Sequence, residues 1–389
     1  MRVAILHDYL TQFGGAERVL ERILEIFPNA DLYTLMYDEG KMHGMFKERL
    51  RKTSFLDHRF FRKWHRLCIP AMPLAAQLLS SDTVYDLVIS STAGYAKGIN
   101  VRGKYHVCYC HSPLRYAWQF EFLRDLPHGV SLVPKFLTRP IAAALRRWDK
   151  RASEKVNVFI ANSHFIAEKI RSYYGRDAYV VYPPIDTVGF TRRASDETKD
   201  YYLMAGRFLY YKRFDLGLRA LQELKLKLKV VGSGPEEEKI RKIANPAYTE
   251  FLGNVPDAEL RRLFASAKGV IFPQEEDFGM VAAEAQACGA PVLAYAKGGG
   301  SEIVRHKETG LLFTEQTKEA IQEAVRECEL REFDRGYISR TAERFSKDVF
   351  VTEFMNVLRR SGFALQEPAP PRTIPPVFAL KKKPSTIRT

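Results

Sequence analysis

The chain has 389 residues, 46% of them hydrophobic and 27% charged. That composition is typical of a globular protein and excludes the disordered, collagen-like and membrane-embedded classes. No apolar run reaches the roughly 20 residues of a membrane-spanning helix, and His7 and Asp8 interrupt the first apolar stretch, so we expect no signal peptide. The net charge of +14 favours anionic partners, namely phosphates, acidic membranes or nucleic acid.

The first half of the chain is predicted to alternate short strands with helices. Val3–Leu6 is an apolar run typical of a buried parallel strand, and Gly14-Gly15 separates it from apolar residues at helical spacing. A strand, a glycine loop and a helix in this order open a doubly wound α/β unit. Further strands are predicted at residues 87–89, 106–109, 156–160 and 179–181.

A second α/β unit follows a proline break at Tyr182-Pro183-Pro184-Ile185-Asp186, because two prolines can continue neither a helix nor a central strand. Its strands are predicted at residues 201–205, 228–231, 250–252, 270–272, 291–294 and 310–313, and a final amphipathic helix at 345–363. We therefore predict an α/β fold of two Rossmann-like, doubly wound parallel-sheet domains facing a cleft. The predicted boundaries are residues 1–184, 185–345, a helix at 346–365 that packs back on the first domain, and a proline-rich basic tail at 366–389.

Five cysteines are spread along the chain without the spacing of a zinc site or of a disulfide framework. They are Cys68, Cys108, Cys110, Cys288 and Cys328. Reduced core thiols are typical of a cytosolic protein. We expect a cytoplasmic location, soluble or peripheral on the inner face of the cytoplasmic membrane.

The strongest motif places two glutamates, Glu276 and Glu284, eight positions apart with Gly279 between them, where a helix is predicted to begin. A helix N-terminus suits phosphate or sugar oxygens. Glu276 could accept hydrogen bonds from sugar hydroxyls, and Glu284 from a ribose. One alternative is a glycosidase acid/base pair, although eight helical residues span about 12 Å, more than such a pair uses. The other alternative is two surface glutamates.

A second motif follows the predicted strand that ends at Ala205. Arg207 and Lys212 lie in the loop after Gly206, at the edge of the sheet where open α/β folds bind ligands. They could hold a diphosphate and stabilise it as a leaving group. A solvated basic loop is the alternative.

Weaker signals come from glycine loops and one histidine. Gly14 and Gly15 allow the backbone to approach a phosphate or a sugar closely, although a plain tight turn has the same sequence. His111 follows a predicted strand and could reach a cleft as a hydrogen-bond donor or general acid/base, or could be structural. The sequence contains no Asp-x-Asp triplet, which argues against a metal that clamps a diphosphate.

Together these motifs resemble the GT-B-fold, retaining glycosyltransferases of family 4, also called glycosyl transferases group 1. The resemblance extends to about Phe363 and is most specific at residues 276–302. It implies that Arg207 and Lys212 bind the donor diphosphate, that Glu276 holds the sugar, and that Glu284 holds the ribose. It further implies contacts to donor or reacting sugar from Gly14, Gly15, Gly206, Val255, Phe278, Gly279, Met280 and His111. The catalytic set is then His111, Glu276, Arg207 and Lys212, with no metal or cofactor, and the nucleotide sugar is the donor substrate.

The variant at residues 275–279, followed by Ala285-Gln286-Ala287-Cys288-Gly289, looks most like GDP-mannose-dependent mannosyltransferases of bacterial O-antigen and exopolysaccharide synthesis. This likeness implies transfer of mannose to a lipid-linked or glycan acceptor in cell-surface polysaccharide synthesis, including lipopolysaccharide. A UDP-sugar donor is the first alternative. A GT-B epimerase or sugar-phosphate synthase is another.

Residues 41–66 carry nine basic and two acidic side chains, a net charge of +7, with Phe55, Phe60, Phe61 and Trp64 interleaved. A basic, aromatic helical stretch is typical of an anionic membrane interface, and a second basic cluster at residues 139–151 could assist. A solvated basic face is the alternative. A basic membrane- or nucleic-acid-binding protein without transferase activity is the hypothesis from another class, but we find no nucleic-acid-binding motif and expect no nucleic-acid partner.

Overall fold

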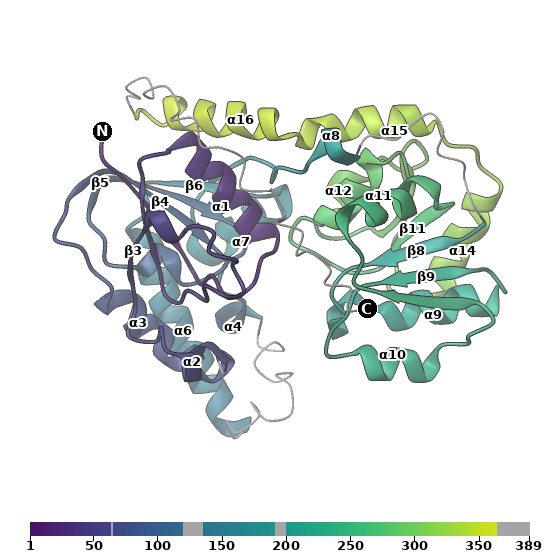
Figure 1. Ribbon diagram of the computed structural model, residues 1–389, viewed down its shortest axis with the longest axis horizontal. Helices are drawn as coiled ribbons and strands as arrows, with labels where there is room; N and C mark the ends of the chain where they lie inside the picture. The colour runs from purple at the N-terminus through teal and green to yellow at the C-terminus, as the bar shows by residue number, and fades with distance from the viewer. Residues whose placement is uncertain (64, 120–134, 191–199, 364–389) are drawn as a thin grey trace, which may run out of the picture.

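The computed structural model describes residues 1–63, 65–119, 135–190 and 200–363. It contains two α/β lobes, each built on a parallel sheet (Figure 1), which confirms the predicted fold class. The first lobe has seven strands in the order β3-β2-β1-β4-β5-β6-β7. Their bounds are β1 Val3–His7, β2 Asp31–Thr34, β3 Leu50–Thr53, β4 Tyr85–Thr92, β5 Gly103–Cys110, β6 Val158–Ala161 and β7 Ala178–Val180.

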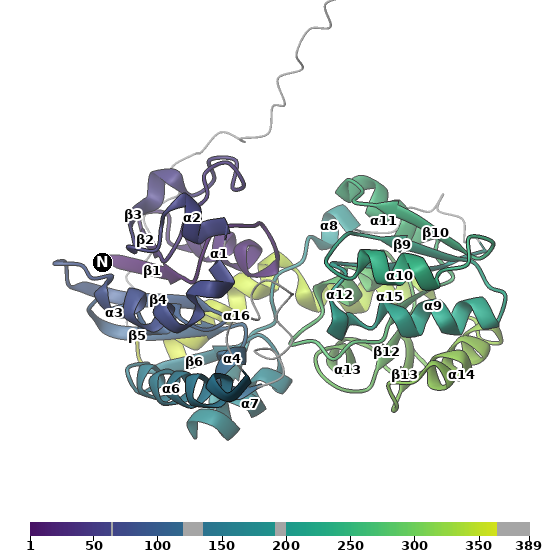
Figure 2. The same ribbon diagram turned by 90° about the horizontal axis from the view of Figure 1, so that it is seen from below.

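Every residue of β1 is buried, because helices cover both faces of a parallel sheet. Helix α1 begins at Gly15 and turns Val19, Leu20 and Ile23 into the core beside β1. The helices of this lobe are α1 Gly15–Ile26, α2 Arg59–Lys63, α3 Met72–Leu78, α4 Arg115–Trp118, α6 Lys135–Glu154 and α7 His164–Tyr174. Figure 2 shows them on both sides of the sheet.

The second lobe has six strands in the order β10-β9-β8-β11-β12-β13. The strands are β8 Tyr202–Ala205, β9 Leu228–Val231, β10 Thr249–Gly253, β11 Gly269–Phe272, β12 Val292–Tyr295 and β13 Gly310–Phe313. The helices are α8 Thr187–Phe190, α9 Phe214–Glu223, α10 Glu237–Ile243, α11 Asp257–Ser266, α12 Met280–Ala287, α13 Gly300–Ile303, α14 Lys318–Glu329 and α15 Arg335–Ala342. Strands β8, β11 and β12 are buried throughout.

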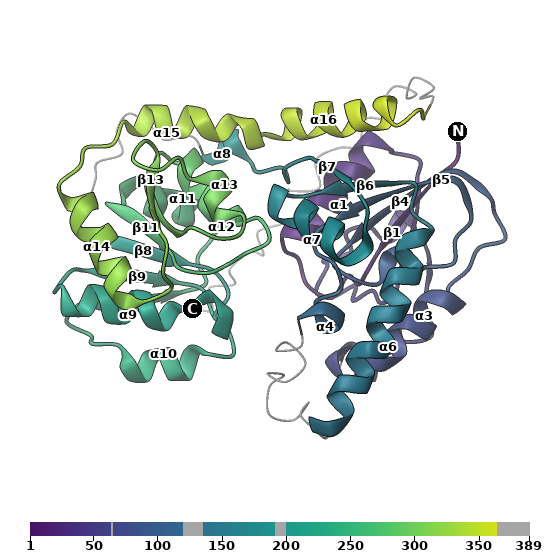
Figure 3. The same ribbon diagram turned by 180° about the vertical axis from the view of Figure 1, so that it is seen from behind.

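The last described helix, α16 Lys347–Arg360, returns from the second lobe to the first (Figures 1 and 3). Phe350 and Phe354 join the core around β1, and their rings lie 5.8 and 6.5 Å from the ring of Tyr109 on β5. The outgoing and returning chains meet where the backbone N–H of Ile185 donates to the carbonyl of Phe345 at 2.9 Å. The chain therefore crosses between the lobes at two adjacent points.

The prediction of a helical stretch at residues 41–66 is wrong in its centre. Leu50–Thr53 forms β3, an edge strand paired with β2. The helical pieces on either side of it are short, namely a 3₁₀ turn at Lys47–Arg49, the helix α2, and the start of a 3₁₀ helix at His65–Ala71. Leu50 packs against the core beneath β2 while Arg51 and Lys52 are exposed, so sheet pairing outweighs local helix propensity. Trp64 and the predicted tail at 366–389 lie outside the described residues.

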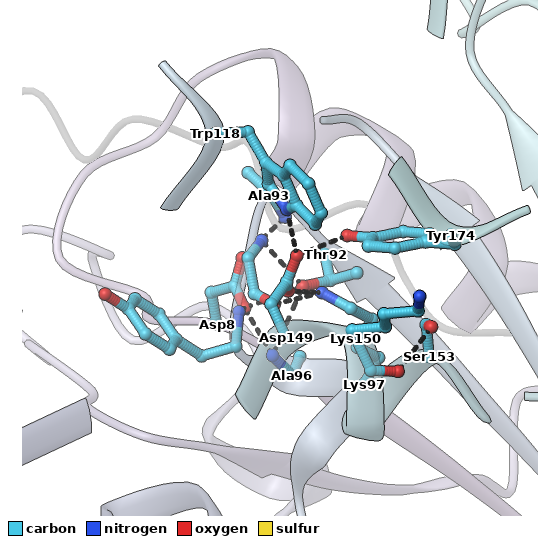
Figure 4. A network of polar contacts seen from close by, with 12 residues as sticks. Asp8, Thr92, Ala93, Ala96, Lys97, Trp118, Asp149, Lys150, Ser153 and Tyr174 are labelled. Carbon is cyan, nitrogen blue, oxygen red and sulfur yellow. Dashed lines mark hydrogen bonds and ion pairs between the residues drawn. The ribbon is translucent and has the colours of Figure 1, made fainter. Parts of the chain in front are cut away.

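A charged network lies in the interior of the first lobe (Figure 4). Lys97 Nζ and Asp149 Oδ1 form a fully buried ion pair of 2.5 Å, and Asp149 Oδ2 accepts hydrogen bonds of 2.7 Å from Trp118 Nε1 and from the Tyr174 hydroxyl. Nearby, Asp8 accepts backbone hydrogen bonds from residues 93, 95 and 96. These contacts satisfy buried charges that would otherwise be costly, and they fix α4, α6 and α7 relative to β4.

All five cysteines are buried and free of disulfides, in agreement with the prediction of core thiols. Among the helices in the described parts of the chain, none is both long and apolar enough to cross a membrane.

Candidate active site

The carboxyl ends of the two sheets face each other, because the loops that follow their strands make the contacts between lobes. From the first lobe these are the loops after β1, β5 and β6, and from the second lobe the loops after β8, β11 and β12. This is the edge of an open α/β sheet at which ligands bind.

Helix α12 provides the centre of the site. It begins at Met280, directly after Gly279, whose φ of 101° is in the left-handed region, where glycine is strongly favoured. A Cβ on Gly279 would also lie 2.9 Å from the Phe272 ring. The predicted helix start is thus correct. This N-terminus lies at the boundary with the first lobe, because a Cβ on Gly15 would meet the Met280 side chain, and the N–H groups of a helix N-terminus stabilise anions.

Lys212 and Glu276 meet beside this helix start. Lys212 Nζ lies 2.5 Å from Glu276 Oε1, and both side chains are largely buried, at 11% and 17% exposure. Burial lowers the pKa of Lys212, but the Glu276 carboxylate outweighs it and holds that pKa above its ordinary value. Lys212 is therefore a firmly protonated ammonium, held where a donor diphosphate was predicted.

Arg207 and Gly206 border a separate hollow on the second lobe. Gly206 has φ +137°, and a Cβ at this position would lie 3.3 Å from Lys212 Nζ. Arg207 Nη1 donates a 3.0 Å hydrogen bond to Gln12 Oε1 of the first lobe. The hollow, about 450 Å³, also includes Val255. Its size and its glycine-rich lining suit a nucleoside next to a diphosphate.

Glu284 is buried on α12 and faces the first lobe. Its Oε1 accepts from Arg18 Nη1 at 2.7 Å. Burial raises the pKa of Glu284 to about 7 despite Arg18, which lowers it, while Asp257 raises it further. The two motif glutamates thus have different cationic partners, Lys212 for Glu276 and Arg18 for Glu284.

The glycine loop after β1 meets the start of α12. The N–H of Gly14 donates to Glu17 Oε2 at 2.8 Å and closes the first turn of α1. A Cβ on Gly15 would lie 2.5 Å from Met280 Sδ. Two residues predicted to contact the donor, Gly15 and Met280, are therefore in contact with each other across the lobes.

His111 follows β5 and lies on the first-lobe side of the interlobe region. Its Nε2 is 2.9 Å from the Ser91 hydroxyl, and its ring is 5.1 Å from that of Tyr109. Burial, and secondarily His7, lowers the pKa of His111 to about 3. The imidazole is neutral at physiological pH, which fits a hydrogen-bonding role better than that of a cationic acid.

The side chain of Phe278, a residue predicted to contact the donor, packs among aromatic rings. It is buried, with ring centroids 5.6 Å from Tyr182 and 5.3 Å from Phe345. This aromatic group anchors the loop between β11 and α12 to the point where the chain crosses between lobes.

Sequence reasoning missed the residues that join the lobes at this site. These are Gln12, Arg18, Arg115, Lys169 and, within the motif itself, Asp277. Arg18 lies one turn into α1 and Arg115 lies just beyond the carboxyl end of β5, so their places near strand ends were signals that could have been used. The residues that they contact in the other lobe could not be predicted from the sequence.

Two family models match the chain. Residues 13–188 match the model described as Glycosyltransferase Family 4, and residues 190–347 match the model described as Glycosyl transferases group 1. The boundary between the two matches falls at the proline break, close to the crossing point between the lobes.

Individual relatives are more distant. The D-inositol 3-phosphate glycosyltransferase of Jonesia denitrificans is 27% identical over 253 residues, 56% of this chain and 60% of that protein. The GDP-mannose-dependent alpha-(1-6)-phosphatidylinositol monomannoside mannosyltransferase of Mycobacterium tuberculosis is 28% identical over 217 residues, 48% of this chain and 56% of that protein. The chain spans about 60% of the length of the first curated relatives that it matches.

The fold has a close counterpart in the crystal structure of Anabaena HepE in complex with UDP. The two structures superpose with a TM-score of 0.66 at 18% identity, over 92% of this chain and 100% of that chain. At this identity the likeness establishes the fold. The two matched models and the shared two-lobed architecture show that the chain belongs to the GT-B-fold glycosyltransferases of family 4, the glycosyl transferases group 1.

Proposed function

We propose that this protein is a retaining glycosyltransferase that transfers a sugar from a nucleotide-sugar donor to an acceptor between its lobes. The observation that carries the proposal is the buried pair Lys212–Glu276 at the start of α12, next to the hollow at Gly206 and Arg207. The nucleoside would occupy that hollow, Glu284 would accept from the ribose, and Glu276 would accept from the sugar hydroxyls.

Lys212 and Arg207 would carry the catalytic charge. As the bond between the anomeric carbon and the diphosphate oxygen breaks, negative charge grows on the diphosphate, and fixed cations stabilise it. The acceptor hydroxyl oxygen bonds to the anomeric carbon on the same face, and its proton passes to the departing diphosphate. We propose that this requires no metal, because Lys212, Arg207 and the α12 N-terminus supply the stabilisation.

GDP-mannose is the proposed donor, and the enzyme would then be an α-mannosyltransferase. The sequence variant around Glu276 and the similarity to a GDP-mannose-dependent relative support this choice. A UDP-sugar is the competing donor, favoured by the UDP complex of the structural neighbour.

The decisive measurement is thermal stabilisation by nucleotides and nucleotide sugars, with and without EDTA, because a ligand that binds only the folded state raises its stability. Strong stabilisation by GDP and GDP-mannose that EDTA leaves unchanged supports the full proposal. Stabilisation by UDP compounds instead would mean that the donor is a UDP-sugar and not GDP-mannose. Absence of stabilisation by any nucleotide overturns the transferase proposal.

The proposed acceptor is a lipid-linked or glycan molecule of cell-surface polysaccharide synthesis, reached from the inner face of the cytoplasmic membrane. Several exposed apolar side chains support a peripheral membrane contact by the first lobe. Phe55 and Phe60 are 54% and 60% exposed within the basic segment 41–66, and Leu74 and Leu78 on α3 are 51% and 61% exposed.

A basic pocket lies beside these leucines. It measures about 260 Å³ between α3 and α6, and of the described residues that line it, three are basic, Arg147, Arg151 and Lys155, and none is acidic. Basic side chains flanked by apolar ones suit an anionic lipid surface. Figure 3 shows α3 and α6 side by side on the first lobe.

Sedimentation with vesicles tests this contact. The protein should sediment with phosphatidylglycerol vesicles at low salt and should not sediment with phosphatidylcholine vesicles. The double variant Arg147→Glu with Arg151→Glu should bind phosphatidylglycerol vesicles more weakly. Lys239→Glu with Lys242→Glu, which changes the charge equally on the exposed helix α10, is the matched control. If both double variants bind alike, or if the unaltered protein does not bind, the membrane proposal fails.

A further inference from the structure

The loop that carries Glu276 is held by both lobes. On its own lobe, the N–H of Gly299 donates to the Glu276 carbonyl at 2.8 Å, and a Cβ on Gly298 would lie 2.4 Å from that same oxygen. Glu276 itself turns toward Lys212. The side chain of the neighbouring residue, Asp277, instead pairs with two cations of the first lobe.

Three first-lobe residues hold Asp277. Arg115 of α4 pairs with its Oδ2, Lys169 of α7 lies 3.3 Å from its Oδ1, and the Ser163 hydroxyl donates to its backbone carbonyl at 2.5 Å. The Asp277 and Lys169 side chains are only 13% and 14% exposed. Burial alone would raise the pKa of Asp277, but Arg115 and Lys169 together hold it below its usual value.

A second contact closes the same boundary. Glu302 of α13 accepts hydrogen bonds of 2.8 Å from the backbone N–H groups of His164 and Phe165. N–H groups in the first turn of a helix have no acceptor within the helix, so Glu302 supplies one to α7. Ser163, the N-cap of α7, is the same residue whose hydroxyl reaches Asp277. The start of α7 is therefore bound both to the loop before α12 and to α13, and Figure 3 shows these elements on facing sides of the two lobes.

From this arrangement we infer that Asp277 is a positioning residue, which couples closure of the lobes to placement of the Glu276 carboxylate. We name Asp277, Arg115, Lys169 and Ser163 the Asp277 latch. Glu276 and Asp277 are adjacent, so any shift of Asp277 moves the backbone that carries Glu276. When the lobes separate, Arg115, Lys169 and Ser163 release the loop, and Glu276 loses the second of its two anchors.

The inference rests on the proposed function, since it assigns Glu276 to the transferred sugar. It distinguishes Asp277 from donor-binding residues, because the contacts of Asp277 go to the other lobe and none of them lines the hollow at Gly206 and Arg207. Loss of the latch should therefore lower the rate of transfer more than the affinity for the nucleotide.

Asp277→Asn tests this coupling in the full-length protein. The expected result is a fall in kcat of roughly tenfold to a hundredfold, as misplacement by about 1 Å produces, with the nucleotide Kd changed by no more than about twofold, less than 0.5 kcal/mol. Asp277→Glu keeps the charge and should recover much of the rate. Asp177→Asn removes an exposed carboxylate that pairs with Arg171 of α7 and serves as the control with unchanged activity.

Hydrogen exchange gives a readout that does not need a substrate. The N–H groups of residues 164–166, protected by Glu302 and Ser163, should exchange faster in Asp277→Asn than in Asp177→Asn. If the unaltered protein binds no nucleotide, the proposed function fails. Hydrogen exchange at residues 164–166 would still show whether Asp277 holds the two lobes together. Unchanged exchange at residues 164–166, unchanged kcat, or a Kd that rises in proportion to the loss of rate would each overturn the inference.

Discussion

Arg18 of the first lobe and Glu284 of the second form an ion pair of 2.7 Å across the site. Arg18 is one-third exposed whereas Glu284 is nearly buried, so the pair is solvated on one side only. Because burial outweighs Arg18 and raises the pKa of Glu284 to about 7, the carboxyl changes its charge near neutral pH. A ribose hydroxyl donates best to the ionised form.

Nucleotide affinity should therefore rise with pH through this range. If Glu284 must be ionised to bind the ribose, affinity between pH 6 and pH 8 increases by up to about tenfold, following the ionised fraction. Glu284→Gln should bind more weakly and with little dependence on pH. Calorimetric titration with the nucleotide that stabilises the protein measures both, and a parallel pH dependence in the two proteins would refute the assignment.

The Glu284 carboxyl should also make the free energy of unfolding depend on pH. Its folded pKa lies above the ordinary value of 4.5, so the folded state binds the proton more tightly than the unfolded state does. The resulting stabilisation is complete below about pH 4.5 and is lost as pH rises through about 7. Glu284→Gln should remove this component from the pH profile of the unfolding free energy, measured with urea at each pH.

Lys212 should contribute mainly to catalysis. Lys212→Ala removes a fixed ammonium from the developing charge of the leaving group, and we expect a fall in kcat of about a hundredfold or more. Lys212→Arg keeps the charge but alters its shape and should be intermediate. Lys239→Ala, at an exposed pair with Glu236 on α10, is the control, and an equal effect of both alanine variants would contradict the role given to Lys212.

The buried pair Lys97–Asp149 should contribute to stability rather than to activity. Asp149→Asn leaves the Lys97 ammonium buried without a counterion, so we expect a loss of about 3–5 kcal/mol. Adding Lys97→Met removes the stranded charge, while the amide oxygen of the introduced asparagine still accepts from Trp118 and Tyr174 in place of the carboxylate, and much of the loss should be recovered. Urea unfolding tests this, and a double variant no more stable than Asp149→Asn would show that charge is not the cause.

Four of the strands that were predicted, β1, β8, β11 and β12, are buried throughout, and this burial is why they appear in the sequence as unbroken apolar runs. Strands β2 and β3, with the sequences DLYT and LRKT, escaped prediction because they mix polar with apolar residues and so do not form an apolar run. The partial burial of Leu50 and the pairing with β2 define β3, and neither can be inferred from the local sequence.

The residues of the site likewise fall into those that could be predicted from the sequence and those that could not. Glu276, Glu284, Arg207 and Lys212 were predicted as site residues from motifs within one lobe, and their roles remain predictions. Their partners across the boundary could not be predicted, because Arg18 and Glu284 lie 266 positions apart and meet only through the packing of two lobes. Asp277 was read as part of a motif, yet its contacts show that it belongs to the boundary between lobes.

Gly299 offers a steric test of the same loop. A Cβ at this position would lie 2.0 Å from the Phe278 carbonyl oxygen and 2.3 Å from its Cα, and backbone atoms cannot yield as a flexible side chain does. Gly299→Ala should displace residues 276–278 and abolish most activity, and it should weaken the protection of residues 164–166 that depends on Asp277.

Gly336→Ala is the matched control on the same lobe. A Cβ there meets only the ends of the Arg340 and Asp334 side chains, each at 3.2 Å, and Gly336 lies in α15, where alanine favours the helix by up to about 1 kcal/mol. This variant should keep its activity and gain slightly in thermal stability. If Gly299→Ala matches it in activity, the close approach of Gly299 to Phe278 does not position Glu276, and the loop tolerates more movement than its contacts imply.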